Sequence, residues 1–289
     1  MKVAVLSGKG GTGKTFAATN LAASADNGVY VDCDVEEPNG HLFFKPQVEY
    51  TESVGVLVPQ VDPQKCSGCR KCVEFCKFNA LAYAAHTLMV FEEMCHSCGG
   101  CTLMCPTGAL TEKVRAIGQV ERGYSEDTLV LSGFLNPGEE SGVPIIQKLL
   151  TMIPDNGAVT VLDAPPGSAC TVLETIQDVD YCILVAEPTV FGVHNLAVVY
   201  ELVTLFRKPY GVIINKYLSQ DNPVTEFCSK SRLNIIGSIP FEQELGKKLA
   251  DGVVVARHNG RYERVFKEIL DRIDEEVASS HEAGAGIKR

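Results

Sequence analysis

Apolar positions in the first part of the chain form short runs separated by helical stretches. Residues 3–6 are apolar and end in glycines, and residues 14–25 follow with helical spacing and many alanines. Residues 29–31 form a second apolar run that ends at Asp32. Short runs that are apolar at every position predict strands buried on both faces, with the intervening helices covering them.

The second half of the chain repeats this alternation. Further buried strands are predicted over residues 159–162, 182–186, 212–214 and 235–239. Helical stretches follow them, for example over residues 193–206 and 223–230. Strands that alternate with helices in this way predict an α/β fold, with a mainly parallel sheet and helices on both of its faces.

Between about residues 55 and 112 the alternation stops and the sequence duplicates itself. The segment CSGCRKCVEFCKFNAL (residues 66–81) returns as CHSCGGCTLMCPTGAL (residues 95–110), with all four cysteines at one offset. We interpret this as an internally repeated module inserted into the main domain. The expected division is a main domain over residues 1–56 and 114–289, with the inserted module over residues 57–113.

Two further elements are predicted after the module. Residues 114–135 alternate enough to form a β-hairpin that turns near residues 125–127. Residues 260–280 predict a charged amphipathic helix, and we expect the tail after it to be disordered. Asp271, Asp274, Glu275 and Glu276 make this helix acidic, whereas a membrane-binding helix would be basic.

Composition limits the functions open to this chain of 289 residues. Its formal net charge of -10 disfavours nucleic-acid and anionic-lipid partners, because like charges repel. The sequence contains no run of 18 apolar residues, the length needed to span a membrane, and its first residues lack the apolar core of a signal peptide. We therefore expect a cytoplasmic protein that is not inserted into a membrane.

Cysteine content changes this picture most. Eight of the twelve cysteines lie between Cys66 and Cys105, in two tight groups. In a reducing compartment, grouped thiols hold metal more often than they form disulfides. Both groups follow the Cys-x2-Cys-x2-Cys-x3-Cys run of bacterial ferredoxins that carry two 4Fe–4S clusters, so the inserted module is expected to be ferredoxin-like.

The spacing also predicts how the eight thiolates divide between two clusters. Three thiolates separated by two residues each bind one cubane, and the fourth cysteine is carried to the other cubane. One cluster is expected on Cys66, Cys69, Cys72 and Cys105, and the second on Cys76, Cys95, Cys98 and Cys101. Two zinc sites are the alternative, although Cys₄ zinc sites usually consist of separated Cys-x2-Cys pairs. Lys77 replaces the proline that usually ends such a run, and proline is not a ligand.

A glycine-rich segment after the first predicted strand matches the phosphate-binding motif G-x-x-x-x-G-K-S/T. The predicted nucleotide-binding residues are Gly8, Lys9, Gly10, Gly11, Thr12, Gly13, Lys14, Thr15 and Phe16. Backbone N–H groups of such a loop, together with the N-terminus of the following helix, bind phosphates. Lys14 is expected to reach the outer phosphates of ATP or ADP, and Thr15 to bind Mg²⁺. A glycine-rich turn without a ligand is the alternative.

The second lysine of this loop, Lys9, makes the chain similar to a superfamily with a deviant P-loop. That superfamily includes the nitrogenase iron protein, the MinD and ParA ATPases and the Mrp-type cluster carriers. The resemblance implies a homodimer with ATP at its interface, in which Lys9 reaches the partner's nucleotide and neutralises charge on the transferred phosphoryl group. A solvated loop lysine is the alternative.

Two acidic loops extend the resemblance. Asp34 follows the second predicted strand, where the family has its first switch, and would orient the attacking water. Asp163 ends a later strand, at the second switch, and would hold Mg²⁺. Asn215 matches the family's adenine-contacting residue. Helix capping by either aspartate, and a simple turn at Asn215, are the alternatives.

Over nearly its whole length, the chain resembles MinD-superfamily ATPases with an inserted ferredoxin domain. This implies an ATP-hydrolysing iron–sulfur protein that couples nucleotide-driven dimer switching to electron transfer or metallocluster handling, with a redox or cluster-accepting protein partner. An Mrp-type cluster carrier is the alternative, but such carriers use a Cys-x-x-Cys near the C-terminus and none follows Cys105. A positioning ATPase like MinD or ParA is a third possibility.

Cys170 is the remaining cysteine of interest. It lies seven residues after Asp163, the same distance as a cluster ligand of the nitrogenase iron protein. The second ligand of that cluster should fall near Leu135, where this chain has no cysteine. A small buried thiol is therefore the simpler interpretation.

Overall fold

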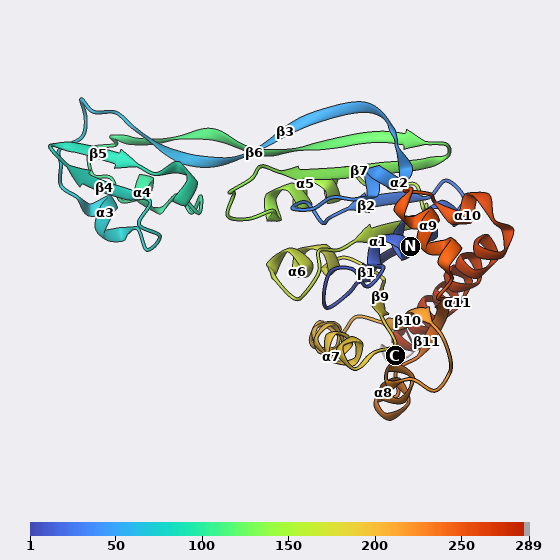
Figure 1. Cartoon of the computed structure of the whole chain (residues 1–289). Coiled ribbons are helices and arrows are strands. Elements are labelled where there is room, and N and C mark those ends of the chain that lie inside the picture. Colours follow the sequence, from blue (N-terminus) through green and yellow to red (C-terminus); the bar gives the residue numbers. More distant parts are fainter. Residues whose placement is uncertain (286–289) are drawn as a thin grey trace.

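The computed structural model describes residues 1–285, with side chains described through residue 279. A nine-stranded sheet forms the centre of the molecule, in the order β11-β10-β9-β1-β8-β2-β7-β6-β3 (Figure 1). Neighbouring strands from β11 to β7 are parallel, whereas β7, β6 and β3 pair antiparallel. The predicted α/β fold with a mainly parallel sheet is therefore confirmed.

The strands that carry the site are close to those predicted from the apolar runs. In chain order the sheet contains β1 (Lys2–Leu6), β2 (Val29–Asp32), β3 (Gln47–Val61), β6 (Leu110–Ser125), β7 (Thr128–Leu135), β8 (Thr160–Asp163), β9 (Tyr181–Ala186), β10 (Tyr210–Tyr217) and β11 (Ile235–Pro240). The hairpin predicted to turn near residues 125–127 is confirmed, because β6 and β7 pair up to Ser125 and Thr128.

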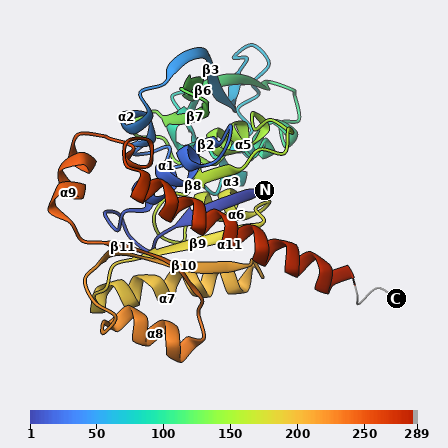
Figure 2. The ribbon, with the colours of Figure 1, turned by 90° about the vertical axis from the view of Figure 1, so that its right-hand side faces the viewer.

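Helices cover both faces of the sheet. The first face holds α5 (Val143–Thr151), α6 (Cys170–Ile176), α7 (Val190–Leu205) and α8 (Pro223–Ser231). The second face holds α1 (Lys14–Ser24), α2 (Gly40–Phe44), α9 (Gln243–Ala250), α10 (Val255–His258) and α11 (Gly260–Ala285). Figure 2 shows α11 crossing this second face. It continues to residue 285, so the disorder expected directly after residue 280 is wrong for residues 281–285, and the rest of the expected tail lies outside the described residues.

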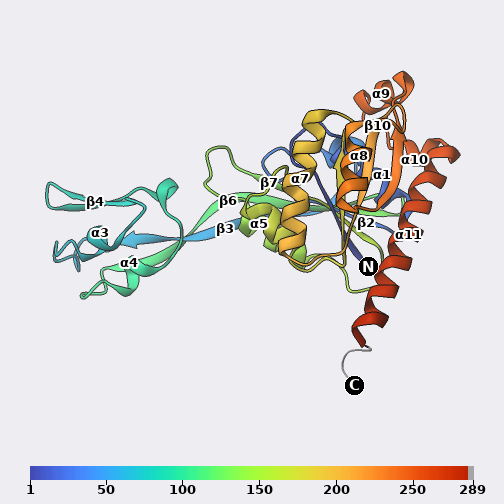
Figure 3. The same cartoon turned by 90° about the horizontal axis from the view of Figure 1, so that it is seen from below.

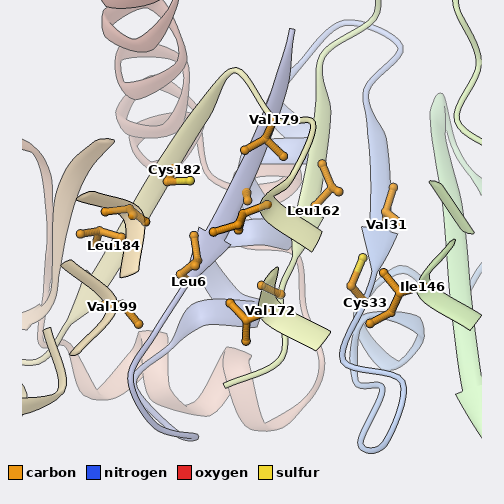
Figure 4. Close-up of a cluster of buried hydrophobic side chains, with 14 of the residues drawn as sticks. Leu6, Val31, Cys33, Ile146, Leu162, Val172, Val179, Cys182, Leu184 and Val199 are labelled. Carbon is orange, nitrogen blue, oxygen red and sulfur yellow. The ribbon is translucent and has the colours of Figure 1, made fainter. Parts of the chain in front are cut away.

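The parallel strands at the centre of the sheet divide their side chains between two cores, even where every position is apolar. Ala4 and Leu6 of β1 belong to the first core, whereas Val3 and Val5 belong to the second. Figure 4 shows the first core, where Leu6 lies among side chains of the neighbouring strands and helices. This period of two in an all-apolar strand is what burial on both faces requires. In the described part of the chain, no helix is both long and apolar enough to cross a membrane.

A long two-stranded ribbon carries the cysteines away from the main domain (Figures 1 and 3). Strands β3 and β6 pair antiparallel from Gln47 and Tyr124 to Val61 and Leu110. At the far end lies a cysteine-rich lobe (residues 62–109), which contains α3 (Lys71–Phe75), β4 (Leu81–Ala84), β5 (Thr87–Val90), η1 (Glu92–Met94) and α4 (Gly100–Leu103). The boundaries expected at residues 56/57 and 113/114 fall inside β3 and β6.

Candidate functional site

The loop between β1 and α1 has a backbone that only glycine accommodates at several positions. Gly11 and Gly13 have φ values of +80° and +95°, in the region that favours glycine. A Cβ on Gly8 would lie 2.2 Å from the carbonyl oxygen of Asn195 in α7. The loop therefore passes close to a neighbouring helix and then delivers Lys14 as the first residue of α1.

Lys14 is buried among carboxylates at the carboxyl ends of two adjacent strands. Its ammonium group donates to Asp163 Oδ1 over 2.6 Å and lies 3.5 Å from Asp34 Oδ2. The other oxygen of Asp163 accepts a hydrogen bond of 2.9 Å from the Tyr30 hydroxyl. Burial alone would lower the pKa of Lys14, but the carboxylates of Asp163 and Asp34 outweigh it and raise that pKa. The lysine is therefore held charged in a largely dry site.

Asp32, which sequence reasoning did not place in the site, is a fully buried carboxyl beside these groups. It accepts hydrogen bonds from the backbone N–H groups of Asp34 (3.2 Å) and Gly40 (2.8 Å). Burial, and then the charge of Asp163, raise the pKa of Asp32 to about 8. Burial also raises the pKa of Asp34, although Lys14 opposes the shift. Its position at the end of β2 was the only sequence signal for Asp32.

The loop after β2, which is expected to be the first switch, is thus organised by Asp32, since that side chain accepts a hydrogen bond from the backbone of Asp34. The structure brings Asp34 and Asp163 together around Lys14, as their places after neighbouring strands predict. The hydrogen bonds of Asp163 go to Lys14 and Tyr30. Its role toward Mg²⁺, and that of Thr15, stay predictions.

Asn215 joins the phosphate loop to a cavity at its side. The amide Nδ2 donates to the carbonyl oxygen of Thr12 over 2.8 Å, and the residue is buried. Asn215 and Phe16 line a cavity of about 70 Å³ together with Phe241 and other residues of the segment that leads into α9. The hydroxyl of Thr12 is buried without a hydrogen-bond partner. Contact of Asn215 with adenine remains a prediction.

Lys9 lies on the outside of the same loop. The residue is exposed, and its carbonyl oxygen accepts a hydrogen bond of 2.8 Å from the Ser7 hydroxyl. Gly10 also faces open space, because a Cβ there would meet no atom within 4 Å. An exposed lysine beside a phosphate loop can reach a second molecule, and this stays a prediction.

The eight grouped cysteines divide between two cavities of the cysteine-rich lobe. One cavity, of about 450 Å³, is lined by Cys76, Cys95, Cys98 and Cys101. The other, of about 20 Å³, is lined by Cys66, Cys69, Cys72 and Cys105. Each set takes three cysteines from one repeat and its fourth from the other, which is the division that the spacing predicts. We call them the second and the first cysteine set, respectively.

The remaining thiols have different surroundings. Cys170, at the start of α6, is exposed, so the expected buried thiol is wrong. This residue lies in the first turn of a short helix, whose buried residues are Val172, Thr175 and Ile176. Cys33, Cys182 and Cys228 are buried. Among the described residues, no group of three or more His, Cys, Asp or Glu side chains is placed to hold a single metal ion. Iron–sulfur and magnesium binding therefore remain proposals.

Comparison with known proteins points to nucleotide binding. A profile described as the CobQ/CobB/MinD/ParA nucleotide binding domain matches residues 3–256. Two uncharacterized proteins of Methanocaldococcus jannaschii are similar to this chain. One is 29% identical over 95% of this chain and 97% of its own length. The other is 28% identical over 75% and 80% of the two chains.

Solved structures of MinD share the fold. The MinD cell division ATPase of Pyrococcus furiosus superposes with a TM-score of 0.58, covering 95% of this chain and 98% of its own. MinD of Pyrococcus horikoshii, complexed with Mg-ADP, gives a TM-score of 0.59 and covers 95% and 96%. Both are 14% identical to this chain, so the likeness concerns the fold alone.

Proposed function

This chain belongs to the CobQ/CobB/MinD/ParA nucleotide-binding family, and on that premise we propose that it is an ATP-hydrolysing iron–sulfur protein. ATP binding at the phosphate loop would change the first switch. The change would be passed to the cysteine-rich lobe, where two 4Fe–4S clusters exchange electrons with a partner protein. The family supports ATP hydrolysis in general, and the coupling to clusters is our inference.

For the nucleotide, the roles follow from the charges and the backbone. The N–H groups of the loop and the charged Lys14 would bind the phosphates. Asp34, partly exposed and 3.5 Å from Lys14, would orient the attacking water. Thr15 and Asp163 would hold Mg²⁺, which supplies positive charge for the phosphates. Lys9 would act on the nucleotide of a second copy of the chain.

For the clusters, the donor chemistry of the two cysteine sets fits the group. Four thiolates are the usual ligands of a 4Fe–4S cluster, which supplies one-electron chemistry when bound. Cys72 and Cys101 are buried with Leu81, Leu88 and Leu110 in the small core of the lobe. That apolar surrounding would shield the inner side of each site from water, whereas Cys69 and Cys98 are exposed.

The observation that carries the coupling is a continuous set of contacts between the first switch and the second cysteine set. Val35, directly after Asp34, accepts a hydrogen bond of 2.8 Å from the N–H of Leu135. Gly142 approaches Val35 so closely that a Cβ there would lie 2.3 Å from the valine side chain. The segment between Leu135 and Gly142, which we call the connecting loop (residues 136–142), is thereby held against the first switch.

The other side of the connecting loop contacts the ribbon and the cysteine-rich lobe. Glu139 forms two hydrogen bonds, of 2.5 and 2.7 Å, with the guanidinium of Arg115 in β6. Glu140 lies 3.8 Å from His96, which follows Cys95 of the second cysteine set. These residues line a common cavity of about 280 Å³. A movement of Asp34 and Val35 would therefore be transmitted through the connecting loop to the second cysteine set.

Delivery of clusters to another protein is the rival function, and one experiment separates the two. Protein with reconstituted clusters is incubated anaerobically with Mg·ATP and an excess of an apo-ferredoxin acceptor. We expect iron and sulfide to stay with this chain through many turnovers of ATP. The proposed electron-transfer role would give way to a carrier role if ATP drove stoichiometric transfer of iron to the acceptor.

A further inference from the structure

The two cysteine repeats share one backbone but carry different side chains. Gly68 of the first repeat and Ser97 of the second have φ values of 71° and 54°. Two residues later, Arg70 and Gly99 have φ values of 60° and 69°. Both loops therefore use the left-handed region at equivalent positions, where glycine is favoured.

At one of these positions the first repeat departs from what the backbone favours. The second repeat has Gly99 and Gly100 where the first has Arg70 and Lys71. A side chain at a left-handed position is disfavoured, so conformational preference does not explain Arg70. Its guanidinium lies over the ring of Tyr83, 5.2 Å from the centroid, and both residues line the cavity of the first cysteine set. The arginine is thus held beside that set.

Basic charge is concentrated around this loop in an otherwise acidic chain. Residues 65–77 carry four basic side chains and one acidic one, against a net charge of -10 for the whole chain. The corresponding segment of the second repeat, residues 94–106, carries no lysine, arginine, aspartate or glutamate. Lys65, Arg70 and Lys71 are all exposed. We call these three residues the basic face.

The basic face also lies at the cysteine set that points away from the ATPase domain. The cavity of the first set is lined by residues 66–110 alone. The second set, in contrast, shares Cys95 with the cavity that reaches Glu139 and Glu140 of the connecting loop. Figure 1 shows the lobe at the end of the ribbon, with its outer side unobstructed by other elements.

We propose that the basic face is the docking surface for a small acidic electron-carrier protein, which it would bring next to the first cysteine set. The proposal rests on the proposed function, because it assumes clusters at both sets. Complementary charge accelerates and orients such an encounter. An extended polyanion such as DNA would also meet the acidic remainder of the chain, whereas a compact acidic protein meets the basic face alone.

A simpler role for the same side chains is to offset the negative charge of the nearby thiolates. That role would show in the redox potential of the first cluster and would leave protein binding unchanged. Docking would instead show in the affinity for the acidic partner protein. One variant tests both roles: Arg70→Gly with Lys71→Gly removes both charges and copies the second repeat. The backbone of that repeat already accepts glycine at both positions.

The test uses the full chain with reconstituted clusters and a strongly acidic ferredoxin in its oxidised form. Binding is measured by anaerobic calorimetry at low and high salt, and iron content is measured for every variant. At low salt the double variant R70G/K71G should bind the ferredoxin about tenfold more weakly, and its affinity should depend less on salt. The charge-matched variant K230S/K267S, on α8 and α11, should bind as the parent does.

Three results would overturn the proposal. The first is equal affinity of R70G/K71G and the parent for the acidic ferredoxin. The second is an equal loss in K230S/K267S, which would mean that overall charge matters and the basic face does not. The third is tighter binding of single-stranded DNA or of a basic cytochrome than of the acidic ferredoxin. Absence of iron from the parent protein would instead contradict the proposed function, so the two failures are distinguishable.

Discussion

The ammonium group of Lys14 is 2.6 Å from a carboxylate oxygen of Asp163, and both side chains are buried. The lysine that is expected to bind phosphate therefore starts from a pair with the aspartate that is expected to serve the metal. Binding of Mg·ATP would give both groups new partners at once. We infer that this exchange starts the movement of the first switch, since Asp34 shares the same lysine.

Asparagine substitutions should separate the roles of the two aspartates. Asp34→Asn keeps the size and removes the charge, so ATP should bind with near-normal affinity while hydrolysis falls by roughly 10²–10⁴. Asp163→Asn should instead weaken nucleotide affinity and change its dependence on Mg²⁺. Steady-state hydrolysis and nucleotide titrations over a range of Mg²⁺ concentrations check both. Normal hydrolysis by Asp34→Asn would leave that residue as a structural cap.

Lys9 should be needed for hydrolysis and dispensable for binding. Lys9→Ala should bind ATP, because its side chain is exposed, yet lose most hydrolysis and the ATP-dependent dimer. Lys14→Ala is the matched comparison and should weaken ATP binding itself. Sedimentation with and without a slowly hydrolysed ATP analogue reports the dimer. Hydrolysis at the parent rate in Lys9→Ala would remove the argument for action in trans.

The main domain could be predicted from sequence because its signals are local. An apolar run such as residues 182–186 predicts a strand buried on both faces, and β9 forms there. The ribbon could not be predicted in the same way. Residues of β3 such as Tyr50 and Leu57 are exposed and only a few of its residues are buried, so the apolar pattern is weak. The partners of Tyr50 and Leu57 in β6 also lie more than 50 residues away.

The candidate site shows the same contrast between features with a local sequence signal and features that depend on long-range contacts. The phosphate loop and the cysteine sets were visible because fixed spacing is a property of the sequence. Asp32 was not, since its importance comes from burial and from two backbone donors that only the folded chain brings together. The connecting loop was also missed, because Glu139 and Arg115 are distant in sequence and form an ion pair between elements.

Cysteine substitutions made in pairs should reveal how the thiolates divide. The intact protein should contain about eight iron and eight sulfide per chain, in keeping with two cubanes. Cys76 and Cys98 line one cavity, so Cys76→Ala with Cys98→Ala should lose only one cluster, about four iron. Cys76→Ala with Cys69→Ala should lose both. The opposite pattern would mean that each repeat binds its own cluster, and zinc without sulfide would exclude clusters altogether.

Stability should depend on pH through Asp32. Its pKa of about 8 in the folded chain exceeds the usual value, so the folded state holds a proton that the unfolded state releases. The free energy of unfolding should therefore fall as pH rises from about 4 to about 8, and Asp32→Asn should flatten this fall. A smaller slope should remain in Asp32→Asn, because the pKa of Asp34 is also raised in the folded chain. Urea unfolding at pH 5.5, 7 and 8.5 gives the measurement, and equal slopes in both proteins would refute it.

The central claim is that the nucleotide and the clusters affect one another, and a redox titration with and without nucleotide tests it most directly. Cluster potentials are measured anaerobically by electron paramagnetic resonance, with a slowly hydrolysed Mg·ATP analogue or none. Coupling of at least fivefold corresponds to a shift of about 40 mV for one electron. We expect such a shift in one cluster of the parent, and a smaller one in Glu139→Gln, which breaks the pair with Arg115. Identical potentials with and without nucleotide, in protein shown to bind both, would contradict the account.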